Sequence, residues 1–308
     1  MRIAPKKQVA VLMGGTSAER EVSLESGRQC ANALRDNGYD VHEINVSADV
    51  DALLASLSPR PDVVFNALHG RAGEDGNIQG LLNLLEIPYT HSVLLASALA
   101  MDKAVARTIF EKQGMTIAKG RLARRDEILA GDVMPRPYVI KPNNEGSSVG
   151  IQIIEEGANG PDPDALNAEM LLVEEFIPGR ELTVAVMGAP GEEPKPLAVT
   201  ELRPTKGFYD YEAKYTEGAT EHLVPAPVPD DLGAKAMAWA ALAHKALDCR
   251  GVTRSDFRYD DTRDALVILE LNTQPGMTQL SLVPEQADHC GIAFTELVRW
   301  MVETARCD

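Results

Sequence analysis

The stretch TRSDFRYDDTRDALVILELNTQPGM, residues 253–277, decides the fold. It predicts two short strands, 253–259 and 265–271, because both are rich in residues that favour extended backbone. The polar run 260–264 between them is typical of a turn. The sequence therefore predicts an antiparallel β-hairpin near the C-terminus.

The register of this hairpin decides which side chains share a face. Centring the turn on Arg263 sets Asp256 opposite Glu270 and Arg254 opposite Asn272. Because side chains alternate along a strand, these four polar residues lie on one face. The other face is mostly apolar and comprises Thr253, Ser255, Phe257, Val267, Leu269 and Leu271.

Two carboxylates directly opposite each other destabilise a strand pair unless something offsets their repulsion. Two carboxylates and an amide oxygen suit Mg²⁺, which keeps positions open for water and substrate phosphates. We interpret Asp256, Glu270 and Asn272 as metal ligands of a nucleotide-phosphate site. An alternative stays open: Asp256 pairs with Arg254 or Arg258, and Glu270 points to solvent.

Composition limits the kinds of partner. The 308 residues allow two or three domains, and an apolar content of 44% with a charged content of 25% is ordinary for a soluble globular protein. The net charge of −16 argues against nucleic acid or an anionic membrane as the main partner, because both would be repelled. Lysines in motifs therefore carry extra weight for a site that binds ATP.

The cysteines and the apolar runs predict a cytoplasmic protein. No CxxC spacing occurs among the cysteines, so we interpret them as reduced thiols; they are Cys30, Cys249, Cys290 and Cys307. The apolar run Val9–Met13 is too short for a signal peptide, and no run approaches the length of a membrane span.

The N-terminal region follows a β-α-β pattern. Strands are predicted over 8–13, 41–46 and 63–67, with a helix running from the glycine pair 14–15 to about Asn37. This order is typical of a parallel sheet. The glycines do not match GxGxxG and no Walker A sequence occurs, so a dinucleotide site is not expected here.

Two residues near the ends of these strands are candidates for ligand contact, because ligands of open α/β sheets bind there. Glu19 follows the first strand and could hold an ammonium group; the alternative is a capping box, Thr16-x-x-Glu19. His69 lies in the glycine-rich segment 68–76, as a ligand contact or as a turn-stabilising residue.

The middle of the chain predicts a phosphate site. A helix over 98–113 carries Lys103, which alone would be an ordinary solvated lysine. Strands 138–140 and 151–154 enclose the loop KPNNEGSSVG, whose backbone N–H groups can cradle phosphate, with Lys141 adding charge. We favour this reading over an ordinary flexible hairpin.

Three further segments have predicted roles. The connector 174–181 between two strands is a hinge whose backbone can read a purine edge. The segment 203–228 shows little periodicity and resembles a lid. Gly276 could present its N–H to a developing oxyanion, and the pair 281–282 opens a turn before Pro284.

The blocks GGTSAEREVSL, ALHGRAGEDG, MDK, KPNNEGSSVG, FYDYEAKY and ELNTQPGMT with SLVP resemble D-alanine–D-alanine ligases of the ATP-grasp superfamily. They cover nearly the whole chain in the right order and are very specific together. The resemblance implies an α/β fold class, with an N-terminal Rossmann-like parallel domain over 1–102. A two-subdomain ATP-grasp fold would follow, divided into 103–182 and 183–308.

The resemblance also implies an activity. Two D-alanine molecules would be joined through a D-alanyl phosphate, with ATP consumed, ADP and phosphate released, and two Mg²⁺ or Mn²⁺ in each active site. The dipeptide would serve peptidoglycan synthesis. The protein would be a cytoplasmic homodimer with small-molecule substrates only. The alternatives are another ATP-grasp carboxylate–amine or D-alanine–D-lactate ligase, and a non-catalytic binding module.

The family roles carry over residue by residue. The ammonium of the first D-alanine would meet Glu19, and the set that closes the lid would be Glu19, Ser147 and Tyr215. The ATP phosphates would meet Lys103, Lys141 and Ser148. The base would meet Glu174, Glu175, Phe176 and Ile177, and the ribose Glu181. The metal ligands would be Asp256, Glu270 and Asn272.

The remaining roles concern the acyl group. Arg254 and the Gly276 N–H would stabilise the tetrahedral oxyanion. The second D-alanine would be held by His69, Lys214, Ser281 and Leu282, with Lys214 also near ATP. Tyr209 would be a further substrate contact. Glu175 replaces a lysine common in the family, so we expect only backbone contact with the base there. Tyr215 resembles the dipeptide-forming type, which makes ester formation a minor alternative.

Overall fold

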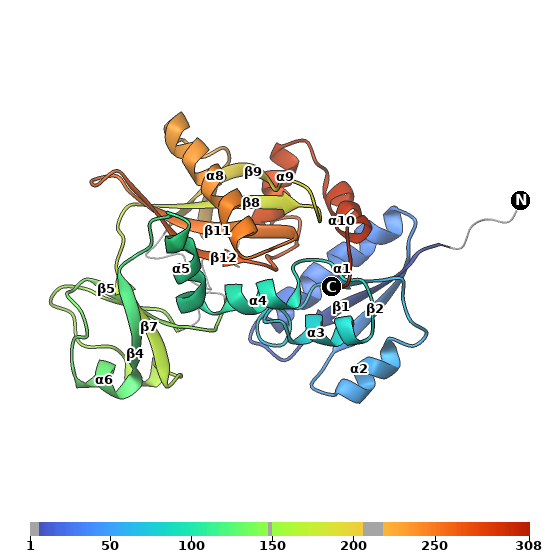
Figure 1. Cartoon of the computed structure of the whole chain (residues 1–308), viewed down its shortest axis with the longest axis horizontal. Coiled ribbons are helices and arrows are strands. Elements are labelled where there is room, and N and C mark those ends of the chain that lie inside the picture. The colour runs from blue at the N-terminus through green and yellow to red at the C-terminus, as the bar shows by residue number, and fades with distance from the viewer. Residues whose placement is uncertain (1–5, 147–149, 206–217) are drawn as a thin grey trace, which may run out of the picture.

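The computed structural model describes residues 6–146, 150–205 and 218–308. Three sheets follow one another along the chain (Figure 1). Each lies largely within one of the three predicted segments. The domain boundaries themselves stay a prediction, and β8 (Arg180–Gly188) spans the second of them. Among the described residues, no helix has the length and apolar character needed to cross a membrane.

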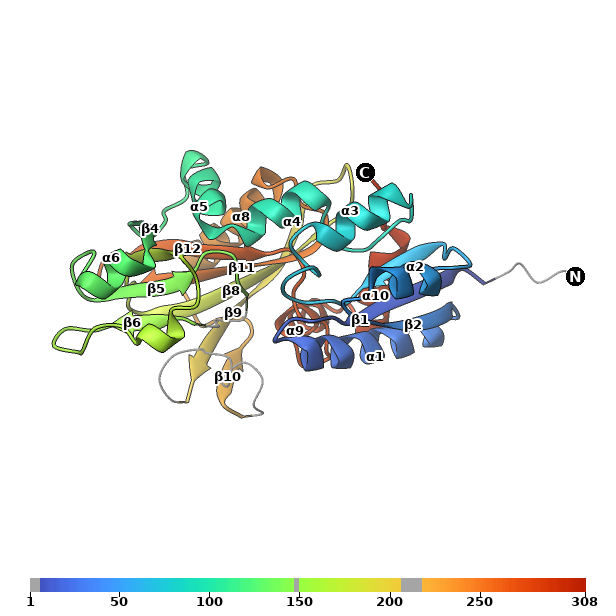
Figure 2. The ribbon, with the colours of Figure 1, turned by 90° about the horizontal axis from the view of Figure 1, so that it is seen from below.

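The first sheet is parallel, as predicted, with strand order β2 (Asp40–Val46), β1 (Gln8–Gly14) and β3 (Val63–Asn66). Apolar side chains of β1 alternate between two cores. One face packs on α1 (Arg20–Asp36) and α10 (Phe294–Glu303), and the other on α2 (Val50–Ser56) and α3 (Asn77–Leu84). Figure 2 shows α1 and α2 on opposite sides of this sheet.

The predicted helix over 98–113 is instead two helices, α4 (Leu94–Met101) and α5 (Lys103–Lys112). Asp102 breaks it, because its extended backbone lets the carboxylate accept the Val105 N–H as an N-cap, at 3.0 Å. The break starts α5 at Lys103.

The second sheet has the order β4 (Gly120–Arg124), β7 (Met170–Glu175), β5 (Tyr138–Pro142) and β6 (Gln152–Ile154). The predicted hairpin around the phosphate loop is confirmed as β5–β6, with Tyr138 opposite Ile154; phosphate binding by this phosphate hairpin stays a prediction. Two short helices lie beside this sheet, α6 (Arg125–Ala130) and a 3-10 turn, Pro163–Ala165.

The third sheet is antiparallel, with the order β10 (Thr220–Leu223), β9 (Lys195–Pro204), β8, β11 (Gly251–Asp260) and β12 (Ala265–Asn272). One face packs on α5 and on α8 (Asp230–Ala246). β10 lies inside the segment 203–228, which was predicted to be a long lid loop, so that prediction was wrong for these residues.

A turn was predicted at 281–282, but the chain forms a helix there, α9 (Leu282–His289). Pro284 does not prevent it, because the N–H groups of the first helical turn have no intrahelical acceptor. Val283 of α9 and Met277 join the core beneath β1. The first and third sheets therefore share one hydrophobic core.

The predicted hairpin is β11–β12, and its register is confirmed at the polar end, where Asp256 faces Glu270. Beyond this pair the register shifts by one residue, so that Phe257 faces Ile268. A bulge of this kind moves the following side chains to the other face.

The predicted placement of Val267 and Leu269 beside Phe257 was therefore wrong. They pack instead against Ala118 and Ile177, on the side of the second sheet. Phe257 packs in the core under α8 with Leu266, Ile268 and Leu271.

Candidate active site

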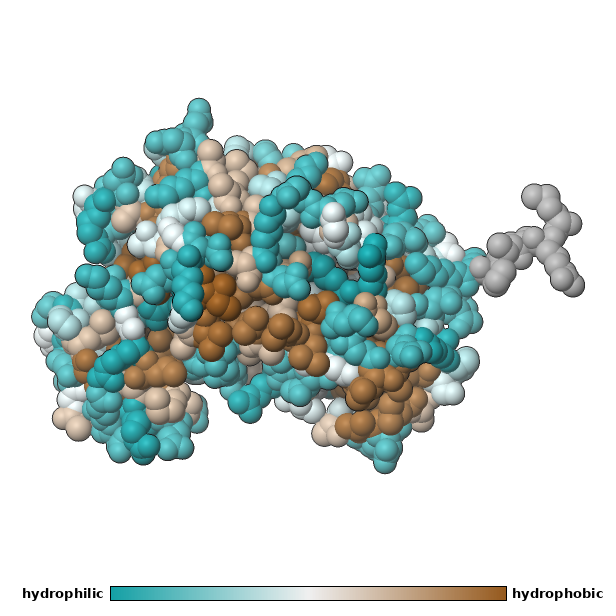
Figure 3. Space-filling view, in the orientation of Figure 1, coloured by the Kyte–Doolittle hydropathy of each residue, from teal (hydrophilic) through white to brown (hydrophobic). Residues whose placement is uncertain are grey.

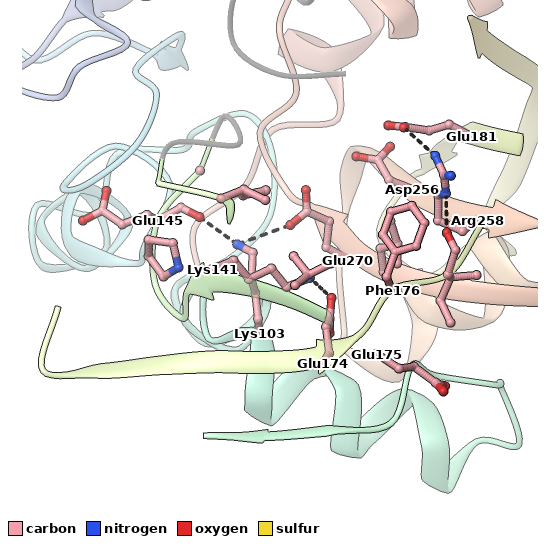
Figure 4. A pocket seen from close by; sticks show the side chains of 16 residues that line it. Lys103, Lys141, Glu145, Glu174, Glu175, Phe176, Glu181, Asp256, Arg258 and Glu270 are labelled. Atoms are coloured by element: carbon pink, nitrogen blue, oxygen red, sulfur yellow. Dashed lines mark hydrogen bonds and ion pairs between the residues drawn. The ribbon is translucent and has the colours of Figure 1, made fainter. Parts of the chain in front are cut away.

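A pocket lies where the second and third sheets face each other (Figure 4). Its lining contains nine of the residues predicted from the sequence: Lys103, Lys141, Glu174, Glu175, Phe176, Ile177, Glu181, Asp256 and Glu270. It also contains apolar residues that the sequence did not single out: Val139, Pro142, Ile151 and Leu269. Leu269 faces the pocket only because of the bulge.

Lys103 is buried rather than solvated, since only 8% of its surface is exposed. Its ammonium donates to the Glu145 carbonyl at 2.7 Å and lies 3.3 Å from a Glu270 carboxylate oxygen. Its own N–H donates to the Asn143 carbonyl, and the Ala104 N–H donates to the Asn143 side chain. The start of α5 is thus bonded to the phosphate hairpin.

Glu174 is buried between two cations. One carboxylate oxygen pairs with the Lys141 ammonium, and the other lies 3.2 Å from an Arg107 guanidinium nitrogen. Arg107 was not predicted from the sequence, although it lies one helical turn after Lys103 on the buried side of α5. Glu174 therefore positions Lys141, while its contact with a base stays a prediction.

Glu175 points away from the pocket interior (Figure 4). Its carboxylate accepts the Lys119 N–H at 3.1 Å, and its N–H donates to the Lys119 carbonyl. The glutamate that replaces the family lysine at this position therefore does not direct its carboxylate at a ligand. The expectation of backbone contact alone stays open.

The facing acids are offset by basic groups. Asp256 accepts two hydrogen bonds from Arg254, both at 2.8 Å, and one from Thr183 at 2.7 Å. The Asn272 amide donates to the same carboxylate at 3.1 Å. The alternative pairing with Arg254 is thus present, but Glu270 faces Lys103 rather than solvent.

The strand-end residues fit a hard divalent cation in their chemistry, because they offer carboxylate and amide oxygens close together. In the described ranges, no group of three or more His, Cys, Asp or Glu side chains is arranged to hold a metal. The candidate set contains only two such residues, Asp256 and Glu270, with Asn272 as the third ligand. Metal binding here stays a proposal.

Glu19 lies at the other end of the site, and the capping-box alternative is wrong. Helix α1 begins after Glu19, whose side chain makes no capping bond. Its N–H donates to the Ser17 hydroxyl, which donates to the His69 carbonyl at 2.7 Å. A Cβ at Gly146 would lie 3.2 Å from a Glu19 oxygen, so this carboxylate adjoins the pocket wall.

Glu74 approaches the same point and was missed by the sequence analysis. Its carboxylate oxygen would lie 3.1 Å from a Cβ at Gly146. Desolvation, with the nearby Glu19 charge, raises the pKa of Glu74 to about 8. The sequence signal for Glu74 was its place in the glycine-rich segment 68–76, but only His69 was singled out there.

His69 is buried next to this acid pair. Desolvation lowers the pKa of the imidazole, although the Glu19 charge opposes the shift, and His69 is therefore neutral near pH 7. Within the described residues, its buried Nε2 has no hydrogen-bond partner. Such an atom indicates a position where a ligand can bond.

The segment after β12 is tied to the first sheet. The Gln274 side chain accepts from the Asn66 amide at 2.8 Å and donates to the Leu68 carbonyl. Neither residue was predicted from the sequence. These bonds place the two ends of the site in one rigid frame.

Gly276 lies beside Ser281, since a Cβ at Gly276 would be 3.0 Å from the Ser281 hydroxyl. Leu282 is buried against Leu202. Five other predicted residues lie outside the described part of the chain, namely Ser147, Ser148, Tyr209, Lys214 and Tyr215.

Comparison with known proteins matches residues 46–92 to the D-ala D-ala ligase N-terminus and residues 115–303 to the D-ala D-ala ligase C-terminus. A D-alanine–D-alanine ligase of Acidiphilium cryptum is 57% identical over 98% of this chain and 99% of its own length. One from Paramagnetospirillum magneticum is 56% identical, with the same shares covered.

The solved structure of the Bacillus anthracis D-alanine–D-alanine ligase complexed with ATP is also similar. Its TM-score is 0.79 at 30% identity, over 98% of this chain and 97% of the other. These likenesses confirm the predicted fold class, an N-terminal α/β domain followed by an ATP-grasp fold. The chain belongs to the D-alanine–D-alanine ligase family.

Proposed function

We propose that this protein joins two D-alanine molecules into D-alanyl-D-alanine, using ATP and releasing ADP and phosphate, for peptidoglycan synthesis. One observation carries the proposal: Gly146 is both a wall of the lysine-containing pocket and a neighbour of Glu19 and Glu74. A nucleotide and an amino acid bound at these two places would therefore meet. The relatives named above support the same activity.

In the first step, the carboxylate of one D-alanine attacks the γ-phosphorus of ATP and forms D-alanyl phosphate. Phosphoryl transfer depends on positioning and charge neutralisation rather than on a protein nucleophile. Lys103 and Lys141 supply positive charge from the pocket wall. Glu19 binds the ammonium and turns the carboxylate toward the nucleotide.

We infer that Asp256, Glu270 and Asn272 hold Mg²⁺ or Mn²⁺ delivered with ATP, two ions in each site. The carboxylates of Asp256 and Glu270 in the pocket lining would repel a polyphosphate unless a cation lies between them. Divalent cations bound there would neutralise the charge that develops on the phosphates. Lys103 and Arg254 could then leave these carboxylates for the phosphate and for the acyl oxygen.

In the second step, the ammonium of the other D-alanine gives up a proton to water and the resulting amine attacks the acyl phosphate carbonyl. Phosphate leaves with the C–O bonding pair, and the new amide nitrogen loses its second proton. Arg254 and the Gly276 N–H face the oxygen that becomes negative. Ser281 lies beside Gly276, where it can hold the second carboxylate. Neutral His69 can bond this substrate through Nε2 without repelling its ammonium.

The assembly and location proposed are a homodimer in the cytoplasm. All four cysteines are free thiols, as expected in a reducing compartment. Helix α4 contains no charged residue, and Leu84, Leu94, Leu95 and Val105 are exposed on it or on the neighbouring helices. Figure 3 shows this hydrophobic patch over α4 and α5. Two copies that each carry a charge of −16 would repel each other least if they met at this hydrophobic patch.

The test of the activity is phosphate release from ATP with D-alanine, L-alanine and D-lactate supplied separately, together with mass detection of the product. Release with D-alanine alone, matched by D-alanyl-D-alanine, supports the proposal. Release with another acid would indicate a different carboxylate–amine ligase, and release with none would indicate a binding module.

A further inference from the structure

We propose that Arg258 is a positioning residue for nucleotide recognition. Its guanidinium holds Glu181 and the 176–179 connector in the arrangement that receives the ribose and the base. The proposal rests on the nucleotide site described above. It concerns a side chain that the sequence analysis considered only as a possible partner of Asp256.

Arg258 contacts the connector at four residues, two of them through backbone carbonyls (Figure 4). Its Nη1 lies 3.3 Å from a Glu181 carboxylate oxygen. Its Nε donates to the Ile177 carbonyl at 3.1 Å, and its Nη2 donates to the Gly179 carbonyl at 2.9 Å. The guanidinium carbon lies 5.9 Å from the centre of the Phe176 ring.

The strand register places Arg258 on the pocket face. It lies directly opposite Glu181 across β11 and β8, and Asp256 lies opposite Thr183 in the same pairing. Because alternate residues share a face, Arg258 and Asp256 point to the same side of the sheet. The nucleotide base end and the proposed metal end are therefore built on one strand.

The ion pair is mostly withdrawn from water, since the side chains of Arg258 and Glu181 are 15% and 12% exposed. Removing Arg258 takes a cationic partner away from this desolvated carboxylate and removes the donors to the connector carbonyls. Glu181 would then be held less firmly in the orientation that accepts a ribose hydroxyl.

The connector fits closely against β11 at this point. Gly179 has a φ of +93°, and a Cβ there would lie 2.1 Å from the Tyr259 carbonyl oxygen. The backbone passes beside Arg258 with no room for another side chain. The guanidinium reaches two carbonyls and a carboxylate from three separate nitrogens, whereas the donors of a lysine share one nitrogen, so lysine would replace only part of its role.

The test is calorimetric titration with Mg²⁺–ATP and with Mg²⁺–2′-deoxyATP, using wild type, Arg258→Met and Arg258→Lys. We expect Arg258→Met to weaken ATP binding about tenfold or more, and to bring the ratio of the two affinities toward one. Arg258→Lys should fall between. The KM for D-alanine should not change, because no contact of Arg258 reaches that end.

Arg28→Met is the control, since Arg28 is an exposed residue of α1. Wild-type affinity and discrimination in Arg258→Met would overturn the proposal. If Arg258→Met does not fold, the double variant Arg258→Lys/Glu181→Gln is compared with the two single variants. A double variant with the same ATP affinity as Glu181→Gln alone supports the proposal, and additive losses of ATP affinity overturn it. A wild type that does not bind ATP would refute the nucleotide site itself.

Discussion

The nucleotide end and the amino-acid end of the site differ in how their acids are compensated. At the nucleotide end, Glu270 faces Lys103 and Glu174 faces Lys141, while Asp256 is bonded to Arg254. These three carboxylates already have cationic partners. A ligand that enters must replace those partners, which a metal-bound polyphosphate can do.

At the amino-acid end, two carboxylates approach the same point beside Gly146. The proximity of Glu19 contributes to the raised pKa of Glu74. Such an arrangement favours a ligand that brings its own positive charge, as the ammonium of an amino acid does. The nucleotide end therefore suits the exchange of one cation for another, whereas the amino-acid end suits the binding of an added positive charge.

The largest expected effect comes from breaking the nucleotide end. Glu270→Gln removes a proposed metal ligand and the partner of Lys103. We expect D-alanine-dependent phosphate release to fall by about a hundredfold or more, to the limit of detection. Circular dichroism should show an intact fold, because the Glu270 side chain is partly exposed. Full activity in this variant would refute the metal assignment.

The next effect isolates the amino-acid end. Glu19→Gln keeps the size of the side chain but loses the charge that meets the ammonium. We expect the KM for D-alanine to rise roughly tenfold to a hundredfold, the usual cost of a lost charged hydrogen bond. ATP affinity, measured by titration, should stay unchanged. A parallel loss of ATP affinity would show that the two ends are not separate.

The bulge in β12 gives a matched pair of leucines. Leu269→Ala alters the pocket wall and should weaken ATP binding several-fold with a small loss of stability. Leu266→Ala removes a side chain of the core under α8 and should cost about 2–5 kcal/mol of unfolding free energy. Its effect on ATP affinity should be small. Thermal unfolding and nucleotide titration of both variants check the prediction; the reverse pattern would contradict the bulge.

The smallest expected effect is a pH dependence of stability. The folded protein holds a proton on Glu74 between the ordinary carboxyl pKa and about 8, where the unfolded chain has released it. Wild-type stability should therefore fall as pH rises through this window. Glu74→Gln should remove that decline. Denaturant unfolding at several pH values would show it, and identical slopes for both proteins would contradict the raised pKa.

Alternation along strands made the polar end of the hairpin predictable. The opposition of Asp256 and Glu270 follows from a turn centre and a period of two. The bulge was not predictable, because apolar residues occupy both faces of β12 and an extra one leaves the pattern unchanged. Leu269 was therefore placed on the wrong face.

Contacts between residues of distant segments could not be predicted from the sequence either. Arg107, Arg258 and Gln274 acquire their roles from carbonyls and carboxylates that only the folded chain brings near them. The role of Glu74 depends on the position of Gly146, in the loop that follows β5. The family motifs identified residues whose chemistry is local, whereas these supporting residues depend on tertiary packing.

The central claim is that a divalent cation replaces the basic groups now bonded to Asp256 and Glu270. Mn²⁺ binding tests it most directly, with the free ion monitored by electron paramagnetic resonance. With ATP present, wild type should take up Mn²⁺, and Glu270→Gln should bind it at least about tenfold more weakly. Equal Mn²⁺ uptake by the two proteins would contradict the account.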